Sequence, residues 1–164
     1  MVMLGIIVAG IGLDQITKAL AIARLAPGES IPILSDVLTL RLLRNPGAAF
    51  STGTSLTVVF SILALVVLIA VSVWVIPRVR SKLWAVAVGM GMAGVAGNFI
   101  DRLVRSPGPF RGHVIDFFSL KHFAVFNVAD ILLTCAAILI VLNTLVFKID
   151  LGGGHVSYSN HESR

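Results

Sequence analysis

The chain has 164 residues, of which 57% are hydrophobic and only 13% are charged. Soluble domains carry about a quarter charged residues, so this composition excludes an ordinary soluble domain, and the large apolar surface excludes a disordered chain. The net charge of +5 does not require a nucleic-acid partner, because basic loops of a membrane protein face anionic lipid headgroups. The single cysteine, Cys135, excludes an intrachain disulfide and a zinc cluster of several thiolates.

Four segments are apolar enough to cross a bilayer, which takes about 20 residues in a helix. We predict spans at residues 2–23, 51–77, 83–100 and 131–147. The first span contains two charged residues, Asp14 and Lys18. A cleaved signal peptide is the alternative for this segment, but no basic residue precedes the apolar run and Asp14 interrupts it. The sequence therefore predicts a mainly α-helical membrane protein with four transmembrane helices.

The four spans leave two long connections, at residues 24–50 and 103–126, on the side of the membrane away from the two termini. In the first connection, Leu38, Leu40 and Leu42 recur at every second position, which is typical of a half-buried strand. We therefore predict a small β-sheet between the first two spans.

The second connection gives a weaker strand signal. A turn is indicated at Ser106–Pro109 by its proline and glycine residues, and short extended pieces are expected at His113–Phe118 and Phe123–Phe126. After the fourth span the chain becomes rich in glycine and serine. We expect residues 1–148 to form the membrane domain and residues 149–164 to be a disordered cytoplasmic tail.

The basic residues give conflicting indications of orientation. The short loop at residues 78–82 has three basic residues in five and no acid, which favours the cytoplasmic side for this loop and for both termini. The two long connections also contain basic residues, and a raw count would favour the opposite orientation. We follow the density of charge in the short loop.

Four of the eight acidic residues gather at one end of the predicted bundle. Asp14, Asp101 and Asp130 lie at the ends of three spans that face the long connections, and Asp116 lies within the second connection. A carboxylate at membrane depth is costly, so it must face the bundle interior or water and have a partner. The sequence therefore predicts a polar site at this end of the bundle.

Helical spacing gives two of these acids a basic partner. Asp14 and Lys18 are four residues apart and share one helix face. Asn98, Asp101 and Arg102 lie on one face of the third span. Such ion pairs can serve the site chemically, or they can be purely architectural and only lock helices together.

Asp116 and Asp130 differ, because neither has a fixed basic neighbour. Asn127 precedes Asp130 by three residues and completes the polar end of the fourth span. Two unpaired carboxylates in a cleft that holds little water push their pKa values apart, so that one keeps its proton while the other ionises. Such a pair can activate water against an amide carbonyl.

The chain lacks the motifs of several other enzyme classes. It has no Gly-x-Ser-x-Gly, no His-Glu-x-x-His and no phosphate-binding loop. Two alternatives remain open from the residues alone. A small proton- or ion-coupled transporter would also use aspartates at membrane depth, although no inverted repeat is evident. A structural membrane protein would use the ion pairs for packing only.

Five short blocks of the sequence, taken together, resemble a known family. In chain order they are Asp14-Gln-Ile-Thr-Lys18, Asn45-Pro-Gly-Ala-Ala-Phe50, Gly97-Asn-Phe-Ile-Asp-Arg102, Val114-Ile-Asp-Phe117 and Phe126-Asn-Val-Ala-Asp130. They resemble, in the same order, the signature blocks of bacterial lipoprotein signal peptidase, also called signal peptidase II. Each block alone is weak evidence, whereas five in order on a four-span chain are specific.

This resemblance implies an aspartyl endopeptidase embedded in the bacterial cytoplasmic membrane. Members of the family remove the signal peptide from diacylglyceryl-modified prolipoproteins by cutting just before the lipidated cysteine, without a metal or organic cofactor. The resemblance further implies cytoplasmic termini and an active site at the extracytoplasmic face. The expected partners are lipidated prolipoproteins and membrane lipid, and we expect a monomer.

The resemblance also assigns site residues. Asp116 and Asp130 match the catalytic pair, in which one carboxylate would activate water and the other would protonate the scissile carbonyl. The residues that match the surrounding polar shell are Asp14, Lys18, Asn45, Gly47, Ala49, Asn98, Asp101, Arg102, Asn127 and Ala129. The strand-bearing first connection would form a small extracytoplasmic sheet that cradles the substrate.

Overall fold

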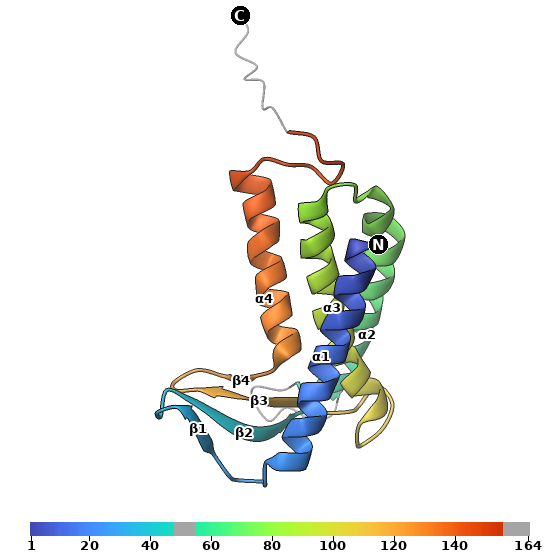
Figure 1. Ribbon diagram of the computed structural model, residues 1–164. Coiled ribbons are helices and arrows are strands. Elements are labelled where there is room, and N and C mark those ends of the chain that lie inside the picture. Colours follow the sequence, from blue (N-terminus) through green and yellow to red (C-terminus); the bar gives the residue numbers. More distant parts are fainter. Residues whose placement is uncertain (48–54, 156–164) are drawn as a thin grey trace, which may run out of the picture.

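The computed structural model describes residues 1–47 and 55–155. Four long helices stand side by side, and a small sheet lies across one end of the bundle (Figure 1). The helices are α1 (Val2–Arg24), α2 (Ser55–Ala70), α3 (Lys82–Val104) and α4 (Val128–Val141). Short π-helical and 3-10 turns extend two of them, namely η1 (Val71–Val75) and η2 (Ile76–Arg78) after α2, and η3 (Leu142–Val146) after α4. All four helical stretches are long and apolar enough to cross a membrane, which confirms the four predicted spans.

Two helices extend beyond their predicted ends because polar side chains are satisfied there. α3 continues to Val104, since Asp101 finds basic partners inside the bundle. α4 begins at Val128, earlier than predicted, because Asn127 caps it. The Asn127 side chain accepts a hydrogen bond from the Asp130 backbone N (3.1 Å), and the Asp130 carboxylate accepts one from the Asn127 backbone N (3.0 Å).

The central helix, α3, packs closely against α1 and α4 because it presents glycines to both. A Cβ added at Gly97 would lie 2.5 Å from Asp14 Oδ2 on α1, and one added at Gly94 would lie 2.6 Å from the Ala129 carbonyl O on α4. Small residues let helix backbones approach closely in membranes. Here they bring the polar ends of three helices together.

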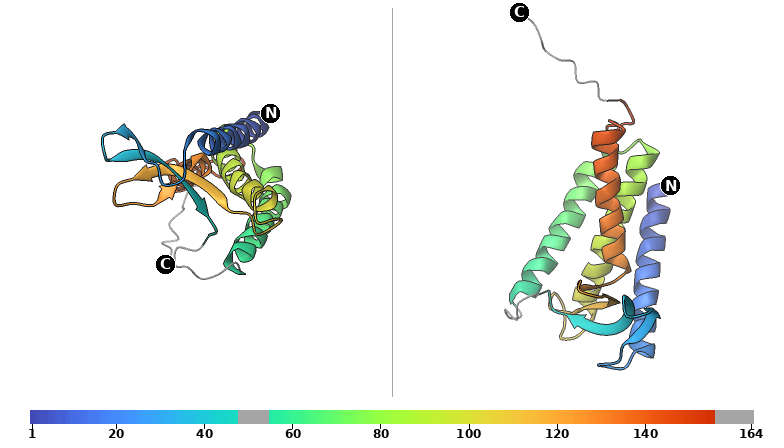
Figure 2. Two further views of the ribbon diagram at one scale, coloured as in Figure 1. Left: turned by 90° about the horizontal axis from the view of Figure 1, so that it is seen from below. Right: turned by 90° about the vertical axis from the view of Figure 1, so that its left-hand side faces the viewer.

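The sheet is antiparallel in the order β1-β2-β3-β4 and projects to one side of the helices (Figure 2). Its strands are β1 (Ile31–Leu34), β2 (Leu38–Asn45), β3 (Val114–Leu120) and β4 (Val125–Phe126). The first two confirm the predicted sheet between the first two spans, and the second connection supplies the other two. In the central pair, Asn45 lies opposite Val114 and Leu43 lies opposite Asp116.

The weak strand signal of β3 has a physical cause. The first four residues of β3 are all buried, so apolar and polar positions do not alternate along it. Ile115 and Phe117 belong to the core cluster, together with Leu25 just after α1 and Val128 of α4. This core holds β3, and with it Asp116, against the ends of the two helices.

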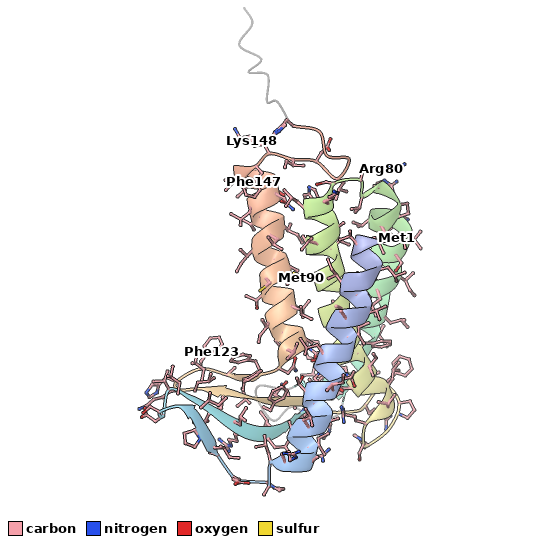
Figure 3. The ribbon with its side chains drawn as sticks, in the orientation of Figure 1. Met1, Arg80, Met90, Phe123, Phe147 and Lys148 are labelled. Carbon is pink, nitrogen blue, oxygen red and sulfur yellow. The ribbon has the colours of Figure 1, made fainter. Side chains whose placement is uncertain are left out.

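The end of the bundle away from the sheet holds the N-terminus, the α2–α3 loop and the end of the fourth helical stretch. Figure 3 shows Met1, Arg80 and Lys148 at this end and Phe123 at the opposite, sheet end. The even number of helices accounts for this arrangement, because each crossing reverses the direction of the chain.

The segment after α4 folds back onto this end, contrary to the disorder expected from residue 149 onward. Residues 149–155 cross toward the α2–α3 loop (Figure 1). The Leu151 carbonyl O accepts backbone hydrogen bonds from the N–H groups of Arg80 (2.8 Å) and Ser81 (3.2 Å). These bonds satisfy two backbone N–H groups of the α2–α3 loop that take no part in helix hydrogen bonds. They hold the segment after α4 in a defined conformation. The rest of the predicted tail, residues 156–164, lies outside the described residues.

Candidate active site

Polar side chains from three helices and one strand meet where the bundle joins the sheet. Five of them are at most 2% exposed, namely Asp14 and Lys18 on α1, Asp101 on α3, Asp116 on β3 and Asn127 at the start of α4. Charged side chains are almost never buried completely unless they are paired. The fourth aspartate of the predicted group, Asp130, lies in the first turn of α4 and is half-buried.

Lys18 is the centre of a buried ion network. Its Nζ lies 2.8 Å from Asp14 Oδ2, 2.8 Å from Asp101 Oδ2 and 2.9 Å from Asn98 Oδ1. These three acceptors can use all three ammonium hydrogens. Arg105 Nε adds a second cation 2.6 Å from Asp101 Oδ1. Asp14 and Asp101 are thus neutralised inside the bundle, where they brace α1 against α3.

Arg102 does not take the position that the sequence suggested. We expected it to neutralise Asp101, but its Nη1 donates to the Asn98 carbonyl O (3.1 Å), and Arg105 pairs with Asp101 instead. Adjacent residues on a helix point about 100° apart, whereas residues four apart share a face. The spacing of Asp101 and Arg105 was therefore the signal that identifies the pair.

Gln15 is a site residue that the spacing argument missed. Its Nε2 lies 3.1 Å from Asp14 Oδ2, 3.0 Å from the Gly97 carbonyl O and 3.3 Å from Asp101 Oδ1. The other oxygen of Asp14, Oδ1, accepts from the Ala129 backbone N (2.9 Å). Gln15 therefore connects α1 to α3, and Asp14 connects α1 to α4. The sequence signal for Gln15 is its place directly after Asp14.

Asp116 and Asp130 are held by amides rather than by cations. Asp116 Oδ1 accepts from Asn127 Nδ2 (2.6 Å), and its Oδ2 accepts from Asn45 Nδ2 (2.9 Å). Asp130 Oδ1 accepts from Asn98 Nδ2 (2.9 Å), and its Oδ2 accepts from the Asn127 backbone N (3.0 Å). Neither carboxylate takes part in an ion pair within residues 1–47 and 55–155. Asn127 bonds to both, so the two acids flank one residue.

The orientation of the Asn98 amide follows from its neighbours. Its oxygen faces two donors, Lys18 Nζ (2.9 Å) and Asn127 Nδ2 (3.1 Å). Its nitrogen is therefore free to donate to Asp130 (2.9 Å). The buried lysine thus orients a donor to this carboxylate without touching it.

Burial raises the pKa of Asp116 from its ordinary value of 3.8 to about 6. The neighbouring Asp130 carboxylate also raises this pKa, whereas hydrogen bonds from Asn45 and Asn127 and the positive charge of Lys18 lower it. Loss of hydration outweighs the two donors because Asp116 is only 2% exposed. A carboxyl group with such a pKa can retain a proton closer to neutral pH than an ordinary aspartate can.

This pKa predicts a pH dependence of stability. An acid whose pKa is higher in the folded protein than in the unfolded chain stabilises the fold below the unfolded value, and this contribution is lost as the pH rises through the folded value. As the pH rises from well below 3.8 to well above 6, we expect the wild type to lose about 3 kcal/mol of unfolding free energy relative to Asp116→Asn. Unfolding of both proteins in detergent measures the difference, and parallel curves would contradict the prediction.

Two largely apolar grooves border the polar cluster. One, of about 240 Å³, lies between α2, α3 and α4 and has Asn98 and Arg102 in its wall. The other, of about 350 Å³, lies between α4 and the β3–β4 hairpin and is lined by Asp130, Phe123 and Cys135, among others. Asp130 therefore borders an open groove, whereas Asp116 is enclosed.

Three small residues of the predicted shell occupy distinct places. Gly47 has a φ of +88°, which favours glycine, and its backbone N donates to Asn45 Oδ1 (2.8 Å). This bond occupies the amide oxygen of Asn45 and leaves its nitrogen for Asp116. Ala129 is fully buried at the start of α4. Ala49 lies outside the described residues.

The arrangement is suited to acid–base chemistry on a bond brought to Asp130. Two carboxyl groups in different surroundings can divide the roles of acid and base. The residues that the structure describes contain no group of three or more histidine, cysteine, aspartate or glutamate side chains that could hold a metal ion.

Comparison with known proteins identifies the family of the chain. The sequence model described as Signal peptidase (SPase) II matches residues 6–146. The chain belongs to this family. It is 44% identical over 142 residues to the lipoprotein signal peptidase of Rhodococcus jostii (strain RHA1). This alignment covers 85% of this chain and 71% of the relative. It is 45% identical over 142 residues to the enzyme of the same name from Mycolicibacterium smegmatis, which covers 86% and 60%.

Solved structures share the fold of this signal peptidase II family member. One bacterial membrane enzyme superposes with a TM-score of 0.77 at 30% identity, over 88% of this chain and 92% of that one. A second gives a TM-score of 0.70 at 28% identity, over 87% of each. Family membership and the four apolar helices together make the chain a multi-pass bacterial membrane peptidase.

Proposed function

We propose that the protein removes the signal peptide from diacylglyceryl-modified prolipoproteins, cutting just before the lipidated cysteine, with Asp116 and Asp130 as the catalytic pair. The observation that carries this proposal is the contact of Asn127 with both carboxylates, neither of which forms an ion pair with any residue that the structure describes. The substrate class comes from the family and from relatives named lipoprotein signal peptidase.

Each acid has the role that its surroundings favour. Asp130 borders a groove and accepts two N–H bonds, so it acts as the base that takes a proton from water. Asp116 is enclosed, and its raised pKa increases the fraction of the protonated form, which donates its proton to the scissile carbonyl oxygen. The water oxygen bonds to the carbonyl carbon. As the intermediate collapses, the C–N bond breaks, Asp130 protonates the leaving amine and Asp116 recovers its proton.

The apolar part of the signal peptide fits a groove between α2 and α4. A cavity of about 520 Å³ follows α3 between these helices. It continues into the smaller groove that contains Asn98 and Arg102, because both are lined by Val67, Val95 and Leu133. A helical segment in this groove would bring the bond that follows it to the polar cluster.

We further propose that the sheet and the site face the outside of the cell. The basic loop at residues 78–82 then lies in the cytoplasm. In a Cys135→Ala background, we expect Ser106→Cys to react with a membrane-impermeant thiol reagent on intact cells and Ser81→Cys to react only after lysis. The reverse pattern would show the opposite orientation.

The function is tested directly by incubating the purified protein with a lipidated prolipoprotein. We expect a gel shift, and mass spectrometry should find the lipidated cysteine at the new N-terminus. The same prolipoprotein without its lipid serves as the control and should stay intact. An uncut lipidated substrate, with proton movement across vesicles that contain the protein, would support the transporter alternative instead.

A further inference from the structure

We propose that residues 149–155 close the end of the α2–α4 groove away from the active site, and thereby limit the length of the apolar segment that the enzyme accepts in a signal peptide. This inference rests on the proposed function and adds to it a residue that selects substrates, Leu151.

The contacts of this segment place it at the groove. The Leu151 carbonyl O accepts from the backbone N–H groups of Arg80 and Ser81, and the Ile149 carbonyl O accepts from Trp84 Nε1 (2.8 Å). Leu151 and Trp84 both line the groove between α2 and α4. The segment therefore runs across the groove from the end of α4 to the beginning of α3, and Leu151 faces the space where a bound helix would end.

The segment has internal bonds of its own, so it is a built closure and not a loose chain. Asp150 donates its backbone N–H to the Gly154 carbonyl O (2.9 Å), and its Oδ1 accepts from the Gly154 backbone N (2.7 Å). Ile149 and His155 form a β-bridge, and the Ile149 backbone N donates to the Asn143 carbonyl O (2.9 Å). A longer helix would have to displace this segment and break its hydrogen bonds to Arg80, Ser81 and Trp84.

The length of the apolar part of the groove matches the apolar core of a signal peptide. Along α3 the lining reaches from Trp84 to Arg102, and the part between Trp84 and Asn98, where the polar cluster begins, covers 14 residues or about 21 Å of helix. A bound helix of the same length holds about 14 residues, and apolar regions of secretory signal peptides have about 7–15 residues. The closed groove therefore holds an apolar segment whose length is near the upper end of the range found in signal peptides.

A substrate series tests the limit. Lipidated prolipoproteins with apolar segments of about 10, 14 and 20 residues bracket the expected range. For the wild type we expect kcat/KM to fall at least about tenfold between 14 and 20 residues, which is the effect of one misfitting apolar group in a pocket. Leu151→Ala should reduce this fall, and Leu151→Trp should extend it to the 14-residue segment. Leu145→Ala is the matched control, because Leu145 is exposed on η3 and lies outside the groove.

The outcomes separate the two proposals. If Leu151→Ala and Leu151→Trp both keep the length dependence of the wild type, the closure does not select substrates. If Leu151→Ala fails to fold, the test depends on Leu151→Trp alone. A fall in kcat/KM that already appears at the 14-residue segment supports the closure, and the length dependence of the wild type overturns it. A wild type that cuts all lengths equally overturns this inference only, whereas a wild type that cuts none overturns the proposed function with it.

Discussion

Asp116→Asn and Asp130→Asn should each reduce the cleavage of a lipidated prolipoprotein by about 10³- to 10⁴-fold, and the double variant should be scarcely slower than either. An amide can neither take a proton from water nor donate one as a carboxylic acid does. The two acids act on one bond in one step, so removing the second costs little once the first is gone. Single-turnover cleavage of a purified substrate measures all three variants.

Both variants should remain folded, because an asparagine keeps one acceptor oxygen for the donors around it. At position 116 these donors are Asn45 and Asn127, and at position 130 the oxygen can still cap α4. Asp101→Asn is the contrasting variant and should lose stability together with activity, since Asp101 bonds to two cations. A folded Asp116→Asn that cuts at nearly the wild-type rate, beside an inactive Asp101→Asn, would move the pair to Asp101 and Asp130.

The largest loss of stability is expected from Lys18→Met. This change leaves Asp14 and Asp101, both fully buried, without the ammonium group between them. Breaking a buried pair by removing one partner costs about 3–5 kcal/mol, because a charge remains without compensation. Unfolding in detergent should show a fall of this size, and cleavage should fall as well because Asn98 loses the donor that orients its amide.

A triple variant separates the two effects of this substitution. Lys18→Met combined with Asp14→Asn and Asp101→Asn removes the stranded charges and should recover much of the lost stability, since neutral replacement of a buried ion group is often tolerated. Its activity should stay low, because the Asn98 oxygen still lacks its lysine donor. Equal stability of Lys18→Met and the wild type would show that these charges do not brace the helices.

Local periodicity predicted most of the fold. Hydropathy over about 20 residues is a strong signal for a span, and all four helices follow it. The alternation of Leu38, Leu40 and Leu42 predicted β2, while β3 carries no alternation because both of its faces are buried. Residues 149–155 have no hydrophobic periodicity. Their defined conformation depends on hydrogen bonds from the backbone N–H groups of Arg80 and Ser81, which are distant in the sequence.

The candidate site was predictable only where its contacts are local. The spacing of Asp14 and Lys18 gave their ion pair, because both lie on one helix face. The contacts of Lys18 with Asp101 and Asn98 join different helices and depend on glycine-mediated packing that no short window reports. The bond from Asn45 to Asp116 depends likewise on the register of two strands from separate connections.

That bond between Asn45 and Asp116 also determines the stage of synthesis and membrane insertion at which the active site can form. It joins residues 71 positions apart in the chain, from connections separated by two membrane crossings. While the chain is being synthesised and inserted, the first connection emerges long before its partner, and Asn127 and Asp130 arrive last, with α4. On the proposed function, a partly inserted chain therefore has no proteolytic activity, and the nascent enzyme cannot cut neighbouring chains before its own insertion is complete.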